Sequence, residues 1–440
     1  MPTQLNEVAA EAIEVDAFST NLGELVPQFK NLYSLALKRF NKVPSSNITA
    51  AGGVTRPSAR VQLRVQGGVG ISQGTGDNDA LPAGGGSQYA GFALSPVVIY
   101  ASNQYTWLAK QATQGKDRGT FNVTARELKY SLQAAETGIE GLMNADGSGA
   151  IDQIPTTATI TTGGSGATTS IIAGMNNVAG FTDQQVVQIF PSIGGSTRGN
   201  ATISFVDPVT NTLNFSTALP STGGATQTGD FIVIAGSSGA QQNSILGLRL
   251  WQNNANTGTL AGLNRANYPS RLQTPTINLN GAPITQTVGL RAATLMDRAQ
   301  GEDSEATESG IWYGGYDQAI AVANLYFNVL IANAQDVKGK EALDTGKGKF
   351  APTFCSREFM PSITALPGRL DLFCPDTWYM FETAPLELYD FGGGSTIMPV
   401  PNTGGTYNSS YLMTYVTAFN VANSNPRAGC FVQNAGIPTI

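Results

Sequence analysis

The stretch GTLAGLNRANYPS, residues 258–270, lies between an almost uncharged, β-rich segment and the first clear helix of the C-terminal half. It contains several small residues, an arginine and an aromatic residue followed by proline. It has no nucleophile beside a base, no pair of metal ligands and no phosphate-binding loop. These residues suit a structural turn better than a reaction, and the surrounding chain indicates which structure the turn serves.

Length and composition set the broad class of the protein. The chain has 440 residues, of which 41% are hydrophobic and 13% are charged. We therefore expect a globular protein of two or three folding units. No apolar run approaches the roughly 20 residues that span a bilayer, and we expect neither a membrane segment nor a signal peptide. The sparse cysteines, Cys355, Cys374 and Cys430, favour a reducing cytoplasm.

Charge and residue types exclude several classes of function. The net charge of −6 disfavours a dedicated nucleic-acid binder, although an acidic shell around nucleic acid would repel phosphate and let packed polymer slide. The chain has no histidine, which excludes Ser-His-Asp catalysis, histidine metal sites and histidine pH switches. We expect no enzyme, no cofactor and no bound metal.

The N-terminal hundred residues predict two arms. ELVPQFKNLYSLALKRF, residues 24–40, predicts an amphipathic helix or an ordinary packed helix. ARVQLRVQ, residues 59–66, alternates apolar and polar residues as a half-buried strand does, and YAGFALSPVVIY, residues 89–100, returns after a Gly-rich loop. An isolated hairpin is marginal in water, so we expect this arm to pack on another subunit; the alternative is a disordered surface loop.

The centre of the chain predicts one long helix followed by short strands. Residues 124–143 begin with the capping-box pattern TARE and repeat apolar residues on one face: Leu128, Leu132, Ala135, Ile139 and Leu142. Residues 153–242 are almost uncharged and predict a small β-barrel or sandwich, with VDPVTNTL as a hairpin turn. The long helix must lie across a sheet or another subunit.

The C-terminal half predicts a mixture of helices and strands. Helices are expected over 286–300 and 318–335, the second with Asp317 as its N-cap. After residue 350, strand-like runs alternate with turns, among them LDLF, TWYMFE, LELYDF and YLMTYVTAFNVAN. The sequence therefore predicts an α+β protein.

Two acidic stretches are candidate ion or catalytic sites. NADGSGAIDQIP, residues 144–155, begins like a calcium loop, but Pro155 replaces the bidentate acid, so a helix-terminating turn is favoured. GEDSEATESG, residues 301–310, could bind a hard cation or supply an acid and a base, but a solvated acidic loop is the favoured interpretation. In a ring of subunits this loop could line the axial opening. Its carboxylates are Glu302, Asp303, Glu305 and Glu308.

The opening stretch, read with its flanks, resembles a known family. GLRLWQNNANTGTLAGLNRANYPSRLQTPTIN, residues 247–278, is similar to a recurrent segment of tailed-bacteriophage major capsid proteins, whose fold is shared with encapsulins. The C-terminal segment AFNVANSNPRAGCFVQNAGI also resembles the closing strand of such proteins, through Asn425, Pro426, Arg427 and Ala428. The residues that match the first segment are Gly262, Leu263, Asn264, Arg265, Tyr268 and Pro269.

The resemblance implies a domain organisation for the whole chain. It implies an N-terminal arm at 1–55, an extended hairpin loop at 56–100 and a peripheral domain with a long spine helix at 101–152, whose returning strands are 376–426. It further implies an inserted β domain at 153–242 and an axial domain at 243–375 and 427–440. Residues 258–270 would then be a structural turn, in which Gly258 and Gly262 permit tight bends, Tyr268 packs, Pro269 sets the chain direction and Arg265 bonds nearby carbonyls or carboxylates.

The implied function is that of a shell protein. Such a chain assembles with itself into hexamers and pentamers of an icosahedral capsid that encloses double-stranded DNA without reading its sequence. It is expected in the virion and, during assembly, in the host cytoplasm, with scaffolding, portal and decoration proteins as partners. The hairpin arm, including Arg60, Arg64, Asp77 and Asp79, would contact neighbouring subunits.

Crosslinking and the rival functions can also be considered from the sequence. No lysine lies between Lys42 and Lys110, so the hairpin loop cannot donate the Lys–Asn isopeptide bond that locks some relatives. The alternatives are another virion component, such as a decoration or tail protein, and a secreted β-rich adhesive or carbohydrate-binding protein. An enzyme that uses the carboxylates of 302–308 is a third.

Overall fold

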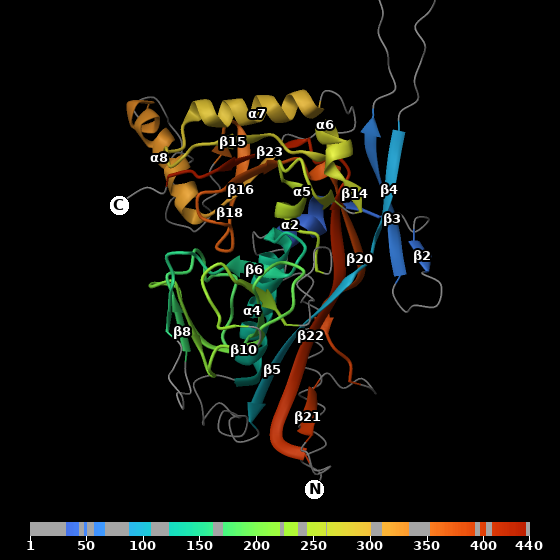
Figure 1. Ribbon diagram of the computed structural model, residues 1–440, viewed down its shortest axis with the longest axis vertical. Coiled ribbons are helices and arrows are strands. Elements are labelled where there is room, and N and C mark those ends of the chain that lie inside the picture. Colours follow the sequence, from blue (N-terminus) through green and yellow to red (C-terminus); the bar gives the residue numbers. More distant parts are fainter. Residues whose placement is uncertain are drawn as a thin grey trace, which may run out of the picture.

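The chain folds into an elongated α+β molecule, which confirms the predicted class (Figure 1). The computed structural model describes residues 32–43, 48–50, 57–66, 88–106, 123–161, 170–220, 224–235, 244–260, 262–300, 310–333, 353–391, 397–401 and 407–436. None of the helices in these ranges is long and apolar enough to cross a membrane.

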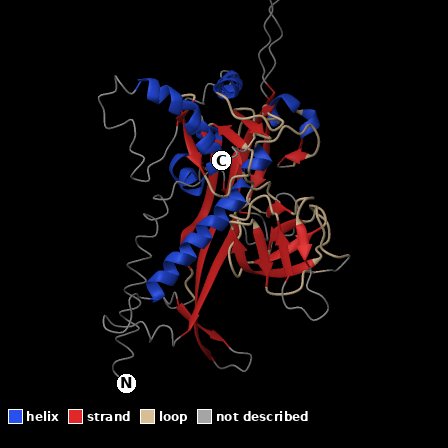
Figure 2. Cartoon of the chain, turned by 90° about the vertical axis from the view of Figure 1, so that its left-hand side faces the viewer, coloured by secondary structure: helices blue, strands red, loops and turns tan. Residues whose placement is uncertain are grey.

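The long helix α4, Val123–Asn144, lies against a five-stranded sheet (Figure 2). Its buried side chains include Leu132, Ala135, Ile139 and Leu142, which are four of the five residues of the predicted apolar stripe. The described helix includes Val123, so Thr124 lies inside the helix and the prediction that it is the N-cap is wrong. The strands of the sheet are β1 (Asn41–Lys42), β20 (Trp378–Leu388), β22 (Tyr407–Asn423) and β21 (Ile397–Pro401), with β5 (Val97–Thr106) also paired to β22.

The base of the hairpin arm packs on the body of its own chain. Strands β2 (Ile48–Ala50), β3 (Pro57–Gln66) and β4 (Gln88–Leu94) form an antiparallel sheet, which confirms the predicted hairpin strands. Val61, Leu63 and Val65 are buried in the main core, and the Phe92 ring lies 5.5 Å from the ring of Trp251. Trp251 and its neighbours therefore cover the apolar face of the described strands within the same chain, and the expected contact of the arm with another subunit stays a prediction.

The hairpin continues directly into the five-stranded sheet. Strand β4 is separated from β5 only by Ser95 and Pro96, and the two strands follow one path across the molecule (Figure 1). The side chain of Asn420 on β22 fixes this junction, because its Nδ2 donates to the carbonyl of Ser95 at 2.8 Å. Its Oδ1 accepts the backbone N–H of Leu246 at 2.9 Å. One amide thus ties the hairpin, the sheet and the segment before α5 together.

The β-rich segment forms a seven-stranded sheet with its own core (Figure 1). The turn between β10 and β11 is the predicted hairpin, and Asn211 adopts a φ of 50° there. The sheet begins at Ala150, ahead of the predicted start at 153. In sheet order the strands are β6 (Ala150–Gln153), β12 (Phe231–Ile234), β9 (Val186–Phe190), β10 (Gly199–Asp207), β11 (Thr212–Phe215), β8 (Ser170–Ala173) and β7 (Thr159–Thr161).

The few charged residues of this segment all make structural bonds. Arg198 and Asp230 form a buried ion pair, with Nε 2.7 Å from Oδ2 and Nη2 3.1 Å from Oδ1. Asp183 accepts the N–H of Val206, and Asp207 accepts the N–H and hydroxyl groups of the β10–β11 turn. The bonds from Thr210 and Val209 lower the pKa of Asp207. The charges therefore fix turns and one core contact rather than form a binding surface.

A six-stranded sheet with two helices forms the remaining body. Helix α7 (Gln286–Gln300) matches the predicted range and packs on β15, β19 and β23. Helix α8 is Tyr316–Asn333, so the predicted cap Asp317 lies inside its first turn. The strands are β15 (Thr276–Asn278), β23 (Gly429–Gln433), β19 (Leu370–Phe373), β16 (Ile311–Gly314), β18 (Arg357–Pro361) and β17 (Thr353–Phe354).

Short elements join these bodies. Helix α2 (Leu32–Arg39) packs on α4, and the ring of Phe40 just after it stacks 5.4 Å from Trp378. The other short elements are α5 (Leu248–Trp251), β13 (Thr259–Leu260), β14 (Leu263–Asn264), α6 (Pro269–Leu272) and the 3-10 helices η3 (Arg265–Asn267) and η4 (Pro375–Thr377). The helix predicted in residues 24–40 is thus present over its last turns, while residues before Leu32 lie outside the described part.

The buried pair in the seven-stranded sheet predicts an effect on stability. Arg198→Ala would leave Asp230 buried without its countercharge and should lower the free energy of unfolding by about 3–5 kcal/mol. Chemical denaturation followed by circular dichroism measures this. The control is Lys42→Ala, which removes a half-exposed partner of Glu382 and should cost less than about 1 kcal/mol. Equal, small losses in both variants would show that the Arg198 pair contributes little.

Candidate functional site

Arg265 is the centre of the turn with which the sequence analysis began. Its side chain is 2% exposed, and its Nη2 donates to the carbonyl of Leu250 at 2.7 Å. Its Nη1 donates to the carbonyl of Leu272, and its backbone N–H donates to Gly258. Burial lowers the pKa of the guanidinium. One cation therefore joins α5, the 258–265 turn and the end of α6.

The other residues of the turn have positions that suit their chemistry. Gly258 and Gly262 have φ angles of 85° and 83°, in the left-handed region that favours glycine. Tyr268 is partly buried against the main core, and Pro269 is at the start of α6, where a missing N–H is tolerated. The hydroxyl of Thr274 then donates to the carbonyl of Pro426 at 2.7 Å, so the two segments that resemble the capsid family meet in space.

The remaining predicted site residues are not brought together by the described structure. Arg60 is exposed on β3, and its side chain lies over Gly91 of the adjacent strand β4. A Cβ placed on Gly91 would be only 2.8 Å from Nε of Arg60. Arg64 belongs to β3, but its side chain lies outside the described part. Four acidic residues and two arm residues also lie outside it: Glu302, Asp303, Glu305, Glu308, Asp77 and Asp79. Their roles stay predictions.

A second centre, which sequence reasoning missed, is the buried carboxylate of Glu140 on α4. Its Oε2 accepts the backbone N–H of Leu32, the first residue of α2, at 2.8 Å. Its Oε1 accepts the hydroxyls of Ser362 at 2.6 Å and Tyr313 at 3.1 Å. Burial raises the pKa of Glu140 to about 7, although these three donors act in the opposite direction. One side chain thus joins α2, α4, β16 and the loop after β18.

A second glutamate lies one helical turn away. Glu136 is 4% exposed, and burial together with the charge of Glu140 raises its pKa to about 8. Its Oε1 is buried without a hydrogen-bond partner in the structure. The sequence does carry a signal for this pair, because Glu136 and Glu140 continue the i, i+4 row of Leu128 and Leu132 on the face that points to the core.

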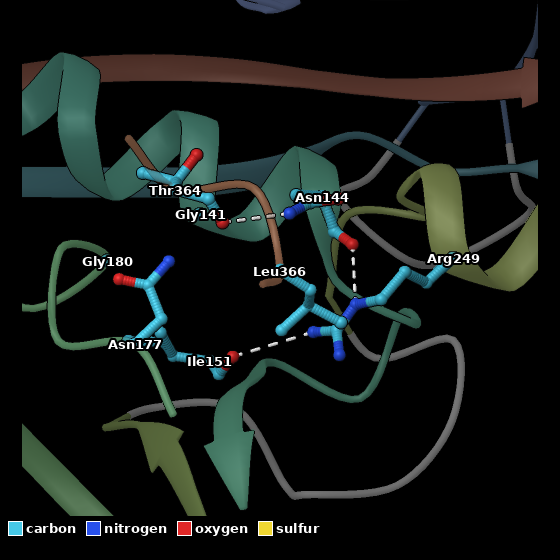
Figure 3. Close-up of a pocket in the computed structure, with 8 residues that line it drawn as sticks. All are labelled: Gly141, Asn144, Ile151, Asn177, Gly180, Arg249, Thr364 and Leu366. Carbon is cyan, nitrogen blue, oxygen red and sulfur yellow. Dashed lines mark hydrogen bonds between the residues drawn. The ribbon is translucent and has the colours of Figure 1, made fainter. Parts of the chain in front are cut away.

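The loop after β18 is held by amide groups from two other bodies (Figure 3). Nδ2 of Asn144, at the end of α4, donates to the carbonyl of Thr364 at 2.9 Å. Nδ2 of Asn177, from the seven-stranded sheet's side, donates to the carbonyls of Ile363 and Ala365 at 3.0 Å and 3.1 Å. Three successive carbonyls of this loop thus accept hydrogen bonds from outside their own sheet. The loop therefore joins α4, the six-stranded sheet and the seven-stranded sheet.

A small pocket lies at the same junction (Figure 3). The guanidinium of Arg249 borders it and donates through Nε to the carbonyl of Asn144 at 2.7 Å. On the seven-stranded sheet's side of the pocket there is little room for a side chain at Gly180, because a Cβ there would lie 2.7 Å from Cγ2 of Ile151 on β6. The pocket is lined by Gly141, Asn144, Ile151, Asn177, Gly180, Arg249, Thr364 and Leu366. It is part of the contact between α4 and the inserted sheet.

These groups hold structure together and offer little to a substrate. Within the described ranges, no group of three or more His, Cys, Asp or Glu residues could hold a metal ion. The calcium-like stretch is a turn in which Oδ1 of Asp146 accepts the N–H and the hydroxyl of Ser148. Glu140, Asn144 and Arg265 therefore make hydrogen bonds that join segments far apart in the sequence.

Comparisons with known proteins point to capsids and an encapsulin. No protein-family model and no curated protein sequence matches the chain. A chain of the cyanophage A-1(L) capsid asymmetric unit is similar at 13% identity over 92% of this chain and 94% of that one, with a TM-score of 0.47. A chain of the capsid of the native GTA particle is similar at 8% identity over 91% and 90%, with a TM-score of 0.43.

The SrpI encapsulin from Synechococcus elongatus PCC 7942 is similar at 9% identity over 80% of this chain and 79% of its own, with a TM-score of 0.36.

The bonds of Arg265 predict that its removal impairs folding. Arg265→Ala would leave two buried carbonyls without donors and should lower the free energy of unfolding by about 3 kcal/mol or more, together with the soluble yield. Thermal unfolding of the purified variant measures this, with Arg298→Ala on the exposed side of α7 as the control. Normal yield, unfolding and assembly of Arg265→Ala would contradict the structural role of this turn.

Proposed function

We propose that this chain is the major capsid protein of a tailed, double-stranded DNA bacteriophage. In this proposal, copies of the chain assemble into hexamers and pentamers of an icosahedral shell that encloses the DNA. Residues 1–55 and 56–100 act as arms, α4 is the spine helix of a peripheral domain, the seven-stranded sheet is an inserted domain, and the six-stranded sheet belongs to the axial domain.

The observation that carries this proposal is the order of elements along the chain. A long hairpin is followed by one 22-residue helix across a sheet, and later by an α/β body. The chain then returns through β20 and the 17-residue strand β22, which pairs with the strand that leaves the hairpin. This order agrees with the one that the family resemblance implies, and the two family-like segments meet through Thr274 and Pro426.

The surface chemistry is consistent with a shell that holds DNA without reading its sequence. The net charge of −6 makes tight, sequence-independent binding of phosphates unfavourable. Exposed aromatic side chains are available for contacts between subunits, and the rings of Tyr100, Tyr389 and Phe391 pack on one another at the surface, at 6.5 Å and 5.2 Å. Scaffolding, portal and decoration proteins are the partners that the proposal implies.

Electron microscopy of the purified full-length protein tests the proposal. We expect closed shells or rings of five and six subunits, alone or after co-expression with a scaffolding protein from the same genome. Tubes would indicate a tail component, and monomers that bind only to existing shells would indicate a decoration protein. Monomers that bind glycans and never assemble would indicate the adhesive alternative, and each of these three outcomes would overturn the proposal.

The position of lysines predicts how the shell is held together. Because the hairpin loop has no lysine between Lys42 and Lys110, it cannot donate an isopeptide bond. Mature particles boiled in detergent should therefore migrate as single chains on a denaturing gel. A ladder of covalent oligomers that survives reducing agent would contradict this prediction.

A further inference from the structure

Two buried carboxyl groups lie next to each other where α4 supports α2. Glu136 and Glu140 are 4% and 3% exposed, and positions i and i+4 share one face of a helix. Two carboxylates this close in a buried site cannot both be ionised without a large cost. One of them therefore keeps its proton while the other carries the charge.

The hydrogen-bond donors decide which glutamate is ionised. Glu140 accepts bonds from the N–H of Leu32 and the hydroxyls of Tyr313 and Ser362, and an ionised carboxylate is an acceptor only. The N–H of Leu32 belongs to the first described residue of α2. Glu136 has a buried Oε1 without a hydrogen-bond partner. In the singly ionised pair the charge therefore lies on Glu140 and the proton on Glu136.

We propose that Glu136 and Glu140 form a proton-gated latch for α2. While Glu136 is protonated, the carboxyl group of Glu140 accepts the N–H of Leu32 on α2 and joins α2 to Tyr313 and Ser362. When Glu136 releases its proton to solvent, a second negative charge appears beside this contact and weakens the docking of α2 on α4. The latch is a property of the chain itself and does not depend on the proposed shell function.

The other titratable groups around the pair stay in one state over the relevant pH range. Tyr33 on α2 has a pKa raised to about 12, mainly by burial, and the charge of Glu382 on β20 adds to the rise. Burial also raises the pKa of Tyr313 on β16 well above its ordinary value. Both phenols therefore stay neutral up to pH 9, and the two glutamates are the groups that titrate.

The direction of the pH effect follows from the two raised pKa values. Both glutamates have an ordinary pKa of 4.5, and the fold raises these values to about 8 for Glu136 and about 7 for Glu140. Between these limits the folded chain binds more protons than the unfolded chain, so stability falls as pH rises. The contribution is fully present below pH 4.5 and is lost above the pKa of Glu136, about 8.

Hydrogen–deuterium exchange of the full-length protein tests the latch. Protection factors for residues 32–39, corrected for the intrinsic rate, should fall by about tenfold or more between pH 6.5 and pH 8 and should level off above pH 9. Protection of β9 in the seven-stranded sheet should change far less. In Glu136→Gln the part of the fall that lies above pH 7, about the pKa of Glu140, should be lost. Glu387→Gln, which changes an exposed glutamate on β20, should keep the whole fall seen in the natural chain.

Infrared spectroscopy gives a second readout that does not require a variant to fold. At pH 7 the natural chain should show the carbonyl stretch of a protonated carboxylic acid, and part of this band should disappear with a midpoint near pH 8. That part should be missing from Glu136→Gln. The proposal is overturned if no such band exists at pH 7, or if α2 has the same protection at pH 6.5 and pH 9. It is also overturned if Glu136→Gln folds and keeps the loss of protection above pH 7.

Discussion

The buried carboxyl group of Glu140 is the contact on which the arrangement of the bodies depends. Its donors come from Leu32, Tyr313 and Ser362, which lie 108, 173 and 222 positions away in the chain. A buried acceptor that loses its donors costs about 1–3 kcal/mol. The packing of α4 in the core is therefore coupled to the positions of α2, β16 and the loop after β18, which makes the core cooperative across distant segments.

The local pattern of apolar and polar residues predicted many of the helices and strands. It failed where an element is held by contacts with residues far away in the sequence. Helix α7 was predicted at its observed bounds because its apolar face repeats within one element. Strand β18 was not predicted, because its Arg357 is buried only through distant contacts, with Met296 and Asp297 of α7. Two predicted runs proved to be the single strand β20, whose register shifts twice between Glu382 and Glu387.

The candidate site likewise has one part that the sequence predicted and one part that it could not predict. The turn around Arg265 could be predicted because its glycines, arginine and proline are neighbours in sequence, although the carbonyls that it bonds could not be named. The role of Glu140 could not be predicted, because no local feature identifies Tyr313 or Ser362 as its donors. Trp251 likewise covers the hairpin's apolar face from a distance of more than 150 positions, which sequence spacing does not reveal.

The passage of β4 into β5 determines how the molecule would respond to mechanical tension. Strand β5 pairs antiparallel with β22 over its whole length, from Val97 to Thr106. Because the bonds of such a ladder are perpendicular to the strands, a pull along the hairpin loads them side by side and does not open them one after another. Tension applied at the arm would thus be distributed along β22, and the hydrogen bonds between β5 and β22 would have to break together.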